Sequence, residues 1–386
     1  MKERSLKNIV PPPIGIKHPC YIIAEAGVNH NGDLNCAKEL VDVAVAAEAD
    51  AVKFQSYISE ELVCRHAQIA EYQRKGGHSA SDQFDLLKRY ELDFRTQKEI
   101  SNYCKRKGIQ FLSSAFDTIS LGFLIDELHL RLLKIPSGEI TNAPLLLQAA
   151  RSQRPMIVST GMCTREEIEK ALTIIAFGIT HPTGWPISEK DLLLSHHSKA
   201  GSRWIKDNIF LLHCTSEYPA PFHSIHLNTM KTIALQFDQV VGYSDHTTGI
   251  HVAIAAVALG AAIIEKHFTL DRKQMGPDHS ASLEPEELRE MISCIRQVEK
   301  SLGSDEKSTT TNEIKNSLVI RKSIVAKKRI EVGEKFRPDN ICCKRPGDGV
   351  SPMHYWTLLG TPSDRIYKPD TLIRFSGDEP VSDKNF

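Results

Sequence analysis

One pattern recurs eight times over roughly the first 280 residues: a short apolar run, a polar cluster and then an amphipathic helix. Short apolar runs that alternate with helices of this kind are typical of a parallel sheet with its helices outside. Eight units favour a closed (β/α)8 TIM barrel over an open doubly wound sheet, and no Gly-rich dinucleotide fingerprint follows the first run. The predicted strands are Tyr21–Glu25, Ala51–Phe54, Ile109–Ser113, Leu132–Ile135, Met156–Ser159, Ile209–His213, Val240–Gly242 and Ala262–Lys266.

The repeated strand and helix pattern stops after residue 302, where the last long amphipathic helix of the predicted barrel ends. Residues 303–318 are mostly polar, which predicts a linker. From residue 319 to 386 the chain carries short strand patterns and turns, among them Ser323–Ala326, Glu331–Glu334 and Ile341–Lys344. We therefore expect an α/β protein with a barrel over 1–302, a linker over 303–318 and a small β-rich domain over 319–386.

Composition excludes several classes of partner. Lys plus Arg and Asp plus Glu both number 48, so no overall field draws the protein to nucleic acid or to an anionic membrane. The nine cysteines include no CxxC pair, which indicates a reducing compartment. The start, Met1–Lys17, is charged and proline-rich where a signal peptide needs an apolar core. We expect a cytoplasmic protein with no membrane and no nucleic-acid partner.

Histidines end the seventh and eighth strand patterns. His246 follows Val240–Gly242 closely, and His267 follows the next strand. In a parallel barrel both would reach the C-terminal face, where active sites lie. One such histidine alone is more often a core residue with a backbone partner, but two on neighbouring strands point to a divalent metal with open coordination positions.

Lysines occupy equivalent places at the ends of strands two and four. Lys53 and Lys134 are each flanked by apolar residues, and Ser114, Ser137 and Ser159 end strands three to five. A single lysine there is more often a solvated surface charge. Two of them together with hydroxyl donors indicate a site for a small, strongly anionic ligand.

These residues, taken in order, resemble the sialic acid synthase family from about Tyr21 to Pro369. The final stretch, from Arg321 through the Lys344–Gly349 turn, is similar to that family's antifreeze-like SAF domain. The matching motifs are Ile23–Gly32 (IAEAGVNHNG), Val52–Gln55 (VKFQ), Lys134–Glu139 (KIPSGE), Ser159–Met162 (STGM), His213–Pro219 (HCTSEYP), Ser244–His246 (SDH), Glu265–Thr269 (EKHFT) and Gly276–His279 (GPDH).

The resemblance implies condensation of phosphoenolpyruvate with an N-acetylated mannosamine-type sugar and water, giving a nine-carbon acid and phosphate. It also implies a divalent metal, usually Mn2+ with Mg2+ or Co2+ as alternatives, held by His246 and His267. The implied substrate ligands are Lys53, Gln55, Ser114, Lys134, Ser137, Ser159, Ser216, Tyr218, Ser244 and Arg345. Several relatives carry Asn or Thr in place of Ser216, which leaves that contact open.

The reaction needs carboxylates that position water, accept its proton and bind sugar hydroxyls. Glu25, Glu139 and Asp278 suit these tasks, although each could instead form an ion pair with a site lysine. Family members form dimers in which the small domain covers the partner's barrel. The resemblance thus implies a domain-swapped homodimer in which Arg345 contacts the sugar's N-acetyl group.

The identity of the sugar stays open at this stage. N-acetylmannosamine would lead to N-acetylneuraminate, our main reading, whereas 2,4-diacetamido-2,4,6-trideoxymannose would lead to N,N'-diacetyllegionaminate. A heptulosonate-type synthase would need a second basic cluster that the sequence lacks, and a non-catalytic sugar-binding protein remains a rival. Two insertions stand out: residues 56–92 suit a flap over the site, and residues 178–208, with three histidines, suit packing more than metal binding.

Overall fold

The computed structural model describes residues 19–65, 67–68, 82–186 and 188–375. The chain separates into two compact units, residues 1–303 and 304–386. The boundary between the units lies directly after Gly303, the first residue of the predicted linker. The charged, proline-rich start, residues 1–17, and the last eleven residues of the predicted small domain lie outside the described residues.

The first unit is a closed barrel of eight parallel strands in sequence order, as the pattern of apolar runs predicts. Each predicted strand is present, and no strand end differs from its prediction by more than three residues. The strands are β1 Tyr21–Gly27, β2 Ala51–Ser56, β3 Gln110–Ala115, β4 Leu133–Ile135, β5 Met156–Ser159, β6 Ile209–Cys214, β7 Val240–Asp245 and β8 Ile263–His267.

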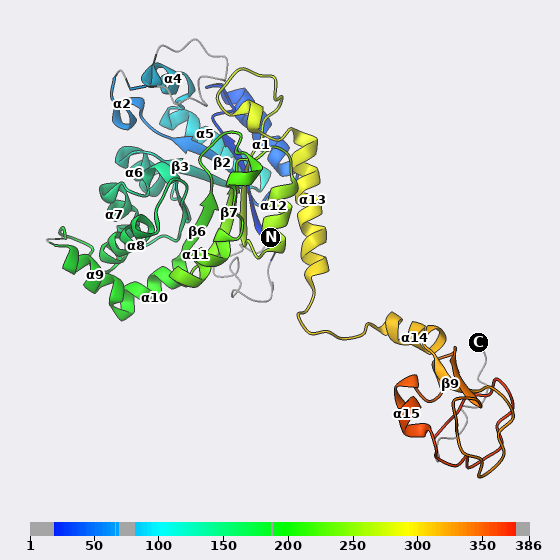
Figure 1. Ribbon diagram of the computed structural model, residues 1–386. Coiled ribbons are helices and arrows are strands. Elements are labelled where there is room, and N and C mark those ends of the chain that lie inside the picture. Colours follow the sequence, from blue (N-terminus) through cyan, green and yellow to red (C-terminus); the bar gives the residue numbers. More distant parts are fainter. Residues whose placement is uncertain (1–18, 66, 69–81, 187, 376–386) are drawn as a thin grey trace. The chain divides into compact units, whose positions relative to one another are not determined.

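A helix follows every strand and covers the outside of the barrel (Figure 1). These helices are α1 Leu34–Ala46, α5 Phe94–Lys107, α6 Thr118–Asp126, α7 Ala143–Arg151, α8 Arg165–Thr180, α11 Thr229–Phe237, α12 His251–Ala258 and α13 Pro285–Leu302.

Local sequence explains where these helices begin and end. Asp93 precedes α5, and its carboxylate accepts a hydrogen bond from the backbone N–H of Thr96. Gly108 ends the same helix with a φ of 78°, a conformation that glycine adopts without strain. Thr164 and Glu167 form a reciprocal capping box at the start of α8. The helix boundaries therefore follow from residues close to each end.

Side chains alternate between the two faces of each strand, and this alternation sets the content of the barrel. The lower interior is an apolar layer that includes Ile23, Ala51, Leu112, Ile157 and Ile263. The next inward-facing residue lies two positions later, one layer nearer the C-terminal end. Those residues are polar and buried: Glu25, Lys53, Ser114, Ser159 and Glu265.

The second unit is built around an antiparallel pair, β9 Ser323–Ala326 and β10 Ile341–Lys344. A small apolar core, which includes Ile330, Phe336 and Tyr367, packs against this pair. Glu331–Glu334, one of the short strand and turn patterns of the sequence, forms a turn, with Gly333 at a φ of 80°. A short helix, α15 Tyr355–Leu358, completes the described part of the unit.

The predicted linker, residues 303–318, is only partly irregular. Its second half belongs to helix α14, Thr311–Ile320. Thr310 and Glu313 form a capping box at the start of this helix, a local signal that the polar composition of the segment hides.

The two insertions are partly helical. Within residues 56–92 the structure describes α2, Ser59–Leu62, and α4, Gln83–Tyr90, while residues 66 and 69–81 of the expected flap lie outside the described residues. The insertion after α8 forms α9, Glu189–His197, and α10, Lys199–Asn208. Among the residues that the structure describes, no helix is both long enough and apolar enough to cross a membrane.

Candidate active site

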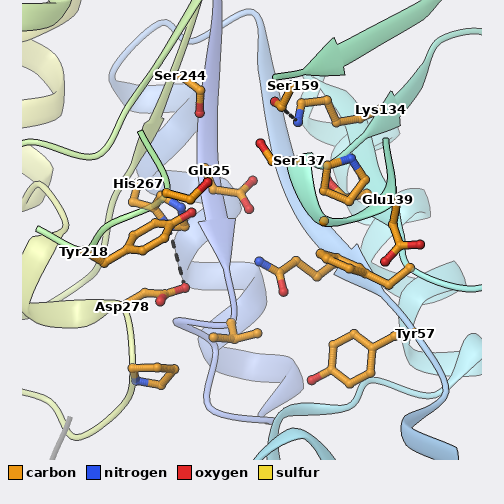
Figure 2. Close-up of a pocket in the computed structure, with 18 of the residues that line it drawn as sticks. Glu25, Tyr57, Lys134, Ser137, Glu139, Ser159, Tyr218, Ser244, His267 and Asp278 are labelled. Atoms are coloured by element: carbon orange, nitrogen blue, oxygen red, sulfur yellow. Dashed lines mark hydrogen bonds and ion pairs between the residues drawn. The ribbon is translucent and has the colours of Figure 1, made fainter. Parts of the chain in front are cut away.

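A cavity of about 490 Å3 opens at the C-terminal ends of the barrel strands. The structure brings fourteen of the fifteen predicted site residues together there (Figure 2). They are Glu25, Lys53, Gln55, Ser114, Lys134, Ser137, Glu139, Ser159, Ser216, Tyr218, Ser244, His246, His267 and Asp278. The fifteenth, Arg345, is exposed and follows β10 in the second unit, so its contact with the sugar stays a prediction.

Two buried lysines lie at the floor of this cavity, next to hydroxyl groups. Lys53 Nζ donates to Ser114 Oγ at 2.9 Å, and Lys134 Nζ donates to Ser159 Oγ at 2.7 Å. Both lysines are 3% exposed, so their charges act in a medium that screens them less than water does. The backbone N–H of Gly161 donates to Ser137 Oγ at 3.0 Å beside them. The floor thus combines two cations with hydroxyls.

Two buried carboxylates face the lysines. Glu25 lies 2.8 Å from Lys53 Nζ, and Glu265 lies 3.7 Å from Lys53 and 3.6 Å from Lys134. Burial raises the pKa of Glu25 to about 7, although Lys53 opposes the shift. Burial also acts to raise the pKa of Glu265, but Lys134 and Lys53 hold it below its ordinary value. The two lysines thus face one carboxyl group whose pKa is raised and one whose pKa is lowered.

Glu265 is the site residue that the sequence reasoning missed. It lies within the EKHFT motif, but the motif alone does not tell which of its four polar residues face the cavity. The alternation of side chains along a strand supplies that information, because Glu265 comes two positions after the interior residue Ile263 and two before His267. Lys266, between them, points to the other face and pairs with the buried Asp245 at 2.9 Å.

His246 and His267 lie side by side at the ends of β7 and β8, with ring centroids 5.7 Å apart. His246 Nδ1 lies 2.6 Å from the carbonyl oxygen of Thr215. Because a carbonyl only accepts, Nδ1 carries the hydrogen and Nε2 keeps its lone pair. Burial lowers the pKa of His246 to about 4 and that of His267 well below its ordinary value, so both rings are neutral at pH 7. Tyr218 packs against both rings.

The surroundings of His267 fit a cation. Its Nδ1 is buried and makes no hydrogen bond among the described residues, and Asp278 Oδ2 lies 3.8 Å away (Figure 2). Burial raises the pKa of Asp278 to about 6, with Lys53 opposing. Within the described ranges no group of three or more His, Cys, Asp or Glu side chains could hold a metal ion. His246 and His267 together supply two neutral nitrogen ligands, and an ion held by them would keep most of its positions for water and substrate.

Glu139 lies apart from the other carboxylates, on the wall formed by the loop after β4 (Figure 2). It belongs to a single 3-10 turn, Ser137–Glu139, and its Oε2 accepts a hydrogen bond from Asn142 at 2.7 Å. Burial raises its pKa above the ordinary value. A carboxyl group in this place can bind or deprotonate a hydroxyl at some distance from the lysines.

Four histidines outside the cavity contact other residues of the barrel or of the 178–208 insertion. His213 Nε2 lies 2.6 Å from the carbonyl oxygen of Ile225, as expected for a structural residue at the end of β6. In the 178–208 insertion, the His181 ring stacks on Phe177 with centroids 4.3 Å apart. His196 and His197 follow each other on α9 with centroids 5.4 Å apart. These contacts favour packing for the insertion.

In this parallel (β/α)8 barrel, lysines, carboxylates and two neutral histidines meet at the C-terminal ends of the strands, where the active sites of such barrels lie. The chain belongs to the NeuB family, which matches residues 40–307, and residues 321–377 match the SAF domain. The resemblance read from the sequence motifs is thereby confirmed.

The relatives share nearly the whole chain. An N,N'-diacetyllegionaminic acid synthase of Campylobacter jejuni is 45% identical over 92% of this chain and 98% of its own length. A second protein of that name, from Legionella pneumophila, is 40% identical over 90% of this chain and 92% of its own. The solved N-acetylneuraminic acid synthetase of Leptospira borgpetersenii is 32% identical, with a TM-score of 0.62 over 78% of this chain and 90% of that structure.

Proposed function

We propose that this protein condenses phosphoenolpyruvate with 2,4-diacetamido-2,4,6-trideoxymannose and water to give N,N'-diacetyllegionaminate and phosphate. The observation that carries the proposal is the 45% and 40% identity to two diacetyllegionaminic acid synthases over at least 90% of the chain. Our main reading of the sequence, N-acetylmannosamine as the sugar, becomes the second candidate. It draws support from the more distant synthetase of Leptospira borgpetersenii.

Phosphoenolpyruvate would bind at the floor of the cavity. Its phosphate and carboxylate require cations and hydroxyl donors, which Lys53, Lys134, Ser114 and Ser159 provide within one buried cluster. The two lysines already face Glu25 and Glu265, so the site is charged but not strongly positive before the anion arrives.

His246 and His267 would hold a divalent metal, which we propose to be Mn2+, with Mg2+ or Co2+ as alternatives. When bound, the ion supplies Lewis-acid polarisation of the sugar's open-chain aldehyde. The Thr215 carbonyl orients the His246 ring, and Tyr218 packs on both rings and keeps them in place. Asp278, 3.8 Å from His267, lies where it can accept a hydrogen bond from a sugar hydroxyl or from water.

The reaction needs a nucleophile, a group that accepts a proton and a leaving group. Carbon three of phosphoenolpyruvate attacks the aldehyde carbon, and water then adds to carbon two. The resulting tetrahedral centre releases phosphate by C–O cleavage. Glu25 lies beside the lysines and has a pKa of about 7, which suits it to take the proton from that water. Glu139 and Asp278, on the outer walls, would bind sugar hydroxyls.

We further propose that the second unit covers a barrel in a domain-swapped homodimer, with Arg345 contacting the sugar's N-acetyl group. The support is the sequence resemblance together with the exposed position of Arg345 beside the turn after β10. Such a cover would exclude water that competes with the aldehyde.

The test is a direct assay. Purified protein is mixed with phosphoenolpyruvate, Mn2+ and one sugar at a time, and both phosphate and the nine-carbon acid are measured. Release of phosphate with each sugar ranks the two candidates by kcat/KM. Binding of sugar without any phosphate release would leave only a non-catalytic sugar-binding protein.

A further inference from the structure

The wall of the cavity contributed by the segment after β2 differs in chemistry from the rest of the site. Tyr57, Leu62, Leu86, Leu87 and Tyr90 line the cavity from this segment. The strand ends, in contrast, contribute the lysines, carboxylates, serines and histidines. We call these five residues the apolar wall.

The apolar wall is packed and presents carbon atoms to the cavity. Leu86 and Tyr90 are 1% and 9% exposed and form a cluster with Val28 from the loop after β1. The Tyr57 hydroxyl donates to the carbonyl oxygen of Leu87 at 3.0 Å, so its hydrogen is already engaged. Such a surface offers little to a sugar hydroxyl but much to a methyl group.

One polar side chain accompanies the wall. Gln83, the first residue of α4, also lines the cavity, and it is the only residue with a polar amide that the described part of this segment contributes to the lining. A glutamine amide can donate to a carbonyl and accept from an N–H at the same time. It therefore matches an acetamido group better than a hydroxyl.

The apolar wall lies where the far end of the sugar must go. The aldehyde end belongs near His246 and His267, and phosphoenolpyruvate belongs at the lysines. Figure 2 shows Tyr57 across the cavity from His267 and Ser244. An extended six-carbon sugar that begins at the histidines would place carbons four to six beside the apolar wall and Gln83, which line the same cavity.

We propose that the apolar wall and Gln83 select a sugar with a methyl group at carbon six and an acetamido group at carbon four. This inference rests on the proposed condensation reaction and assigns its sugar specificity to named residues. The methyl group would pack on Leu62 and Leu86, and the acetamido group would pair with Gln83. N-acetylmannosamine has hydroxyls at both positions, and the hydroxyl at carbon six would lose water at the apolar wall without gaining a partner.

The test compares kcat/KM for 2,4-diacetamido-2,4,6-trideoxymannose and N-acetylmannosamine in the full chain. We expect the unmodified protein to favour the diacetamido sugar by about tenfold to a hundredfold, the range for one altered group in an apolar pocket. Leu62→Asn should reduce that ratio by about tenfold and leave the KM of phosphoenolpyruvate unchanged. Leu87→Asn, at a second half-buried position of the wall, should do the same if Leu62→Asn does not fold.

A matched control is Leu128→Asn. Leu128 is also half-buried, but it precedes β4 and packs at the other end of the barrel, so this variant should keep the original ratio. A folded Leu62→Asn or Leu87→Asn protein with an unchanged ratio would overturn the role of the wall. A preference of the unmodified protein for N-acetylmannosamine would overturn the selectivity itself. Absence of phosphate release with either sugar would instead refute the proposed reaction.

Discussion

Replacing Lys134 by methionine tests the anion site with little disturbance of the fold. Lys134 Nζ donates to Ser159 Oγ at 2.7 Å, and its ion pair with Glu265 is long, at 3.6 Å. Without the ammonium group, Glu265 keeps Lys53 at 3.7 Å and the Ser244 hydroxyl at 3.2 Å. Methionine fills nearly the same volume, so the buried side chain leaves no large cavity.

The expected loss is that of one charge-assisted hydrogen bond to phosphoenolpyruvate. Such a bond contributes about 1.5–3 kcal/mol, which corresponds to roughly a ten- to hundredfold rise in the KM of phosphoenolpyruvate. Lys53→Ala should also weaken phosphoenolpyruvate, but it leaves Glu25 without its 2.8 Å partner and mixes two effects. Lys134→Met is therefore the cleaner change.

The assay follows phosphate release while phosphoenolpyruvate is varied at saturating sugar, and then the reverse. Lys231→Met serves as a control, because Lys231 is exposed on α11 outside the cavity lining. It should leave both KM values unchanged. If Lys134→Met instead raised the KM of the sugar and spared that of phosphoenolpyruvate, the assignment of the floor to phosphoenolpyruvate would be refuted.

Three further predictions concern the metal, the ionisation of the site and the second unit. His246→Ala should abolish turnover without lowering the melting temperature by more than a few degrees, and full activity after exhaustive chelation would contradict a metal. Asp278 has a folded pKa of about 6 against an ordinary 3.8, so its contribution to stability is lost as pH rises through 6. With a chelator present, Asp278→Asn should therefore have a higher free energy of unfolding than the parent chain at pH 8, by about 3 kcal/mol at most. Near pH 3 the two proteins should have equal free energies of unfolding. Equal unfolding at pH 8 would argue against a raised pKa. Deletion from Ser304 onward should leave a barrel that phosphoenolpyruvate still stabilises against heat but that makes almost no product. Mixing Arg345→Ala protein with Lys53→Ala protein should restore part of the activity, because a mixed dimer would combine an intact barrel with an intact small domain. If subunits exchange and activity does not return, a site shared between subunits would be ruled out.

The barrel could be read from the sequence because its determinants are local and repeated. Apolar runs such as Met156–Ser159 and helix caps such as Thr164 depend on neighbours within a few positions. The alternation of side chains along each strand likewise places Lys53 and Ser114 on the inner face, one layer above Ala51 and Leu112. The roles of these residues stay predictions, but their meeting in one cavity was foreseeable.

Tertiary structure decided what depends on contacts between distant segments. The closed barrel brings Glu265 of β8 within 3.6 Å of Lys134 on β4, and Lys266 within 2.9 Å of Asp245 on β7, and no local pattern specifies these partners.

The sequence by itself determined the barrel, the second domain and the set of polar side chains at the strand ends, since strand period and helix capping act over a few residues. Only the tertiary structure decided the pKa values of Glu25 and Asp278, because burial and the nearby Lys53 come from other strands and loops. It also decided that Leu62 and Leu86, more than twenty residues apart, line one wall of the cavity. Electrostatics and apolar surface depend on which groups share a volume, and the folded chain alone sets that.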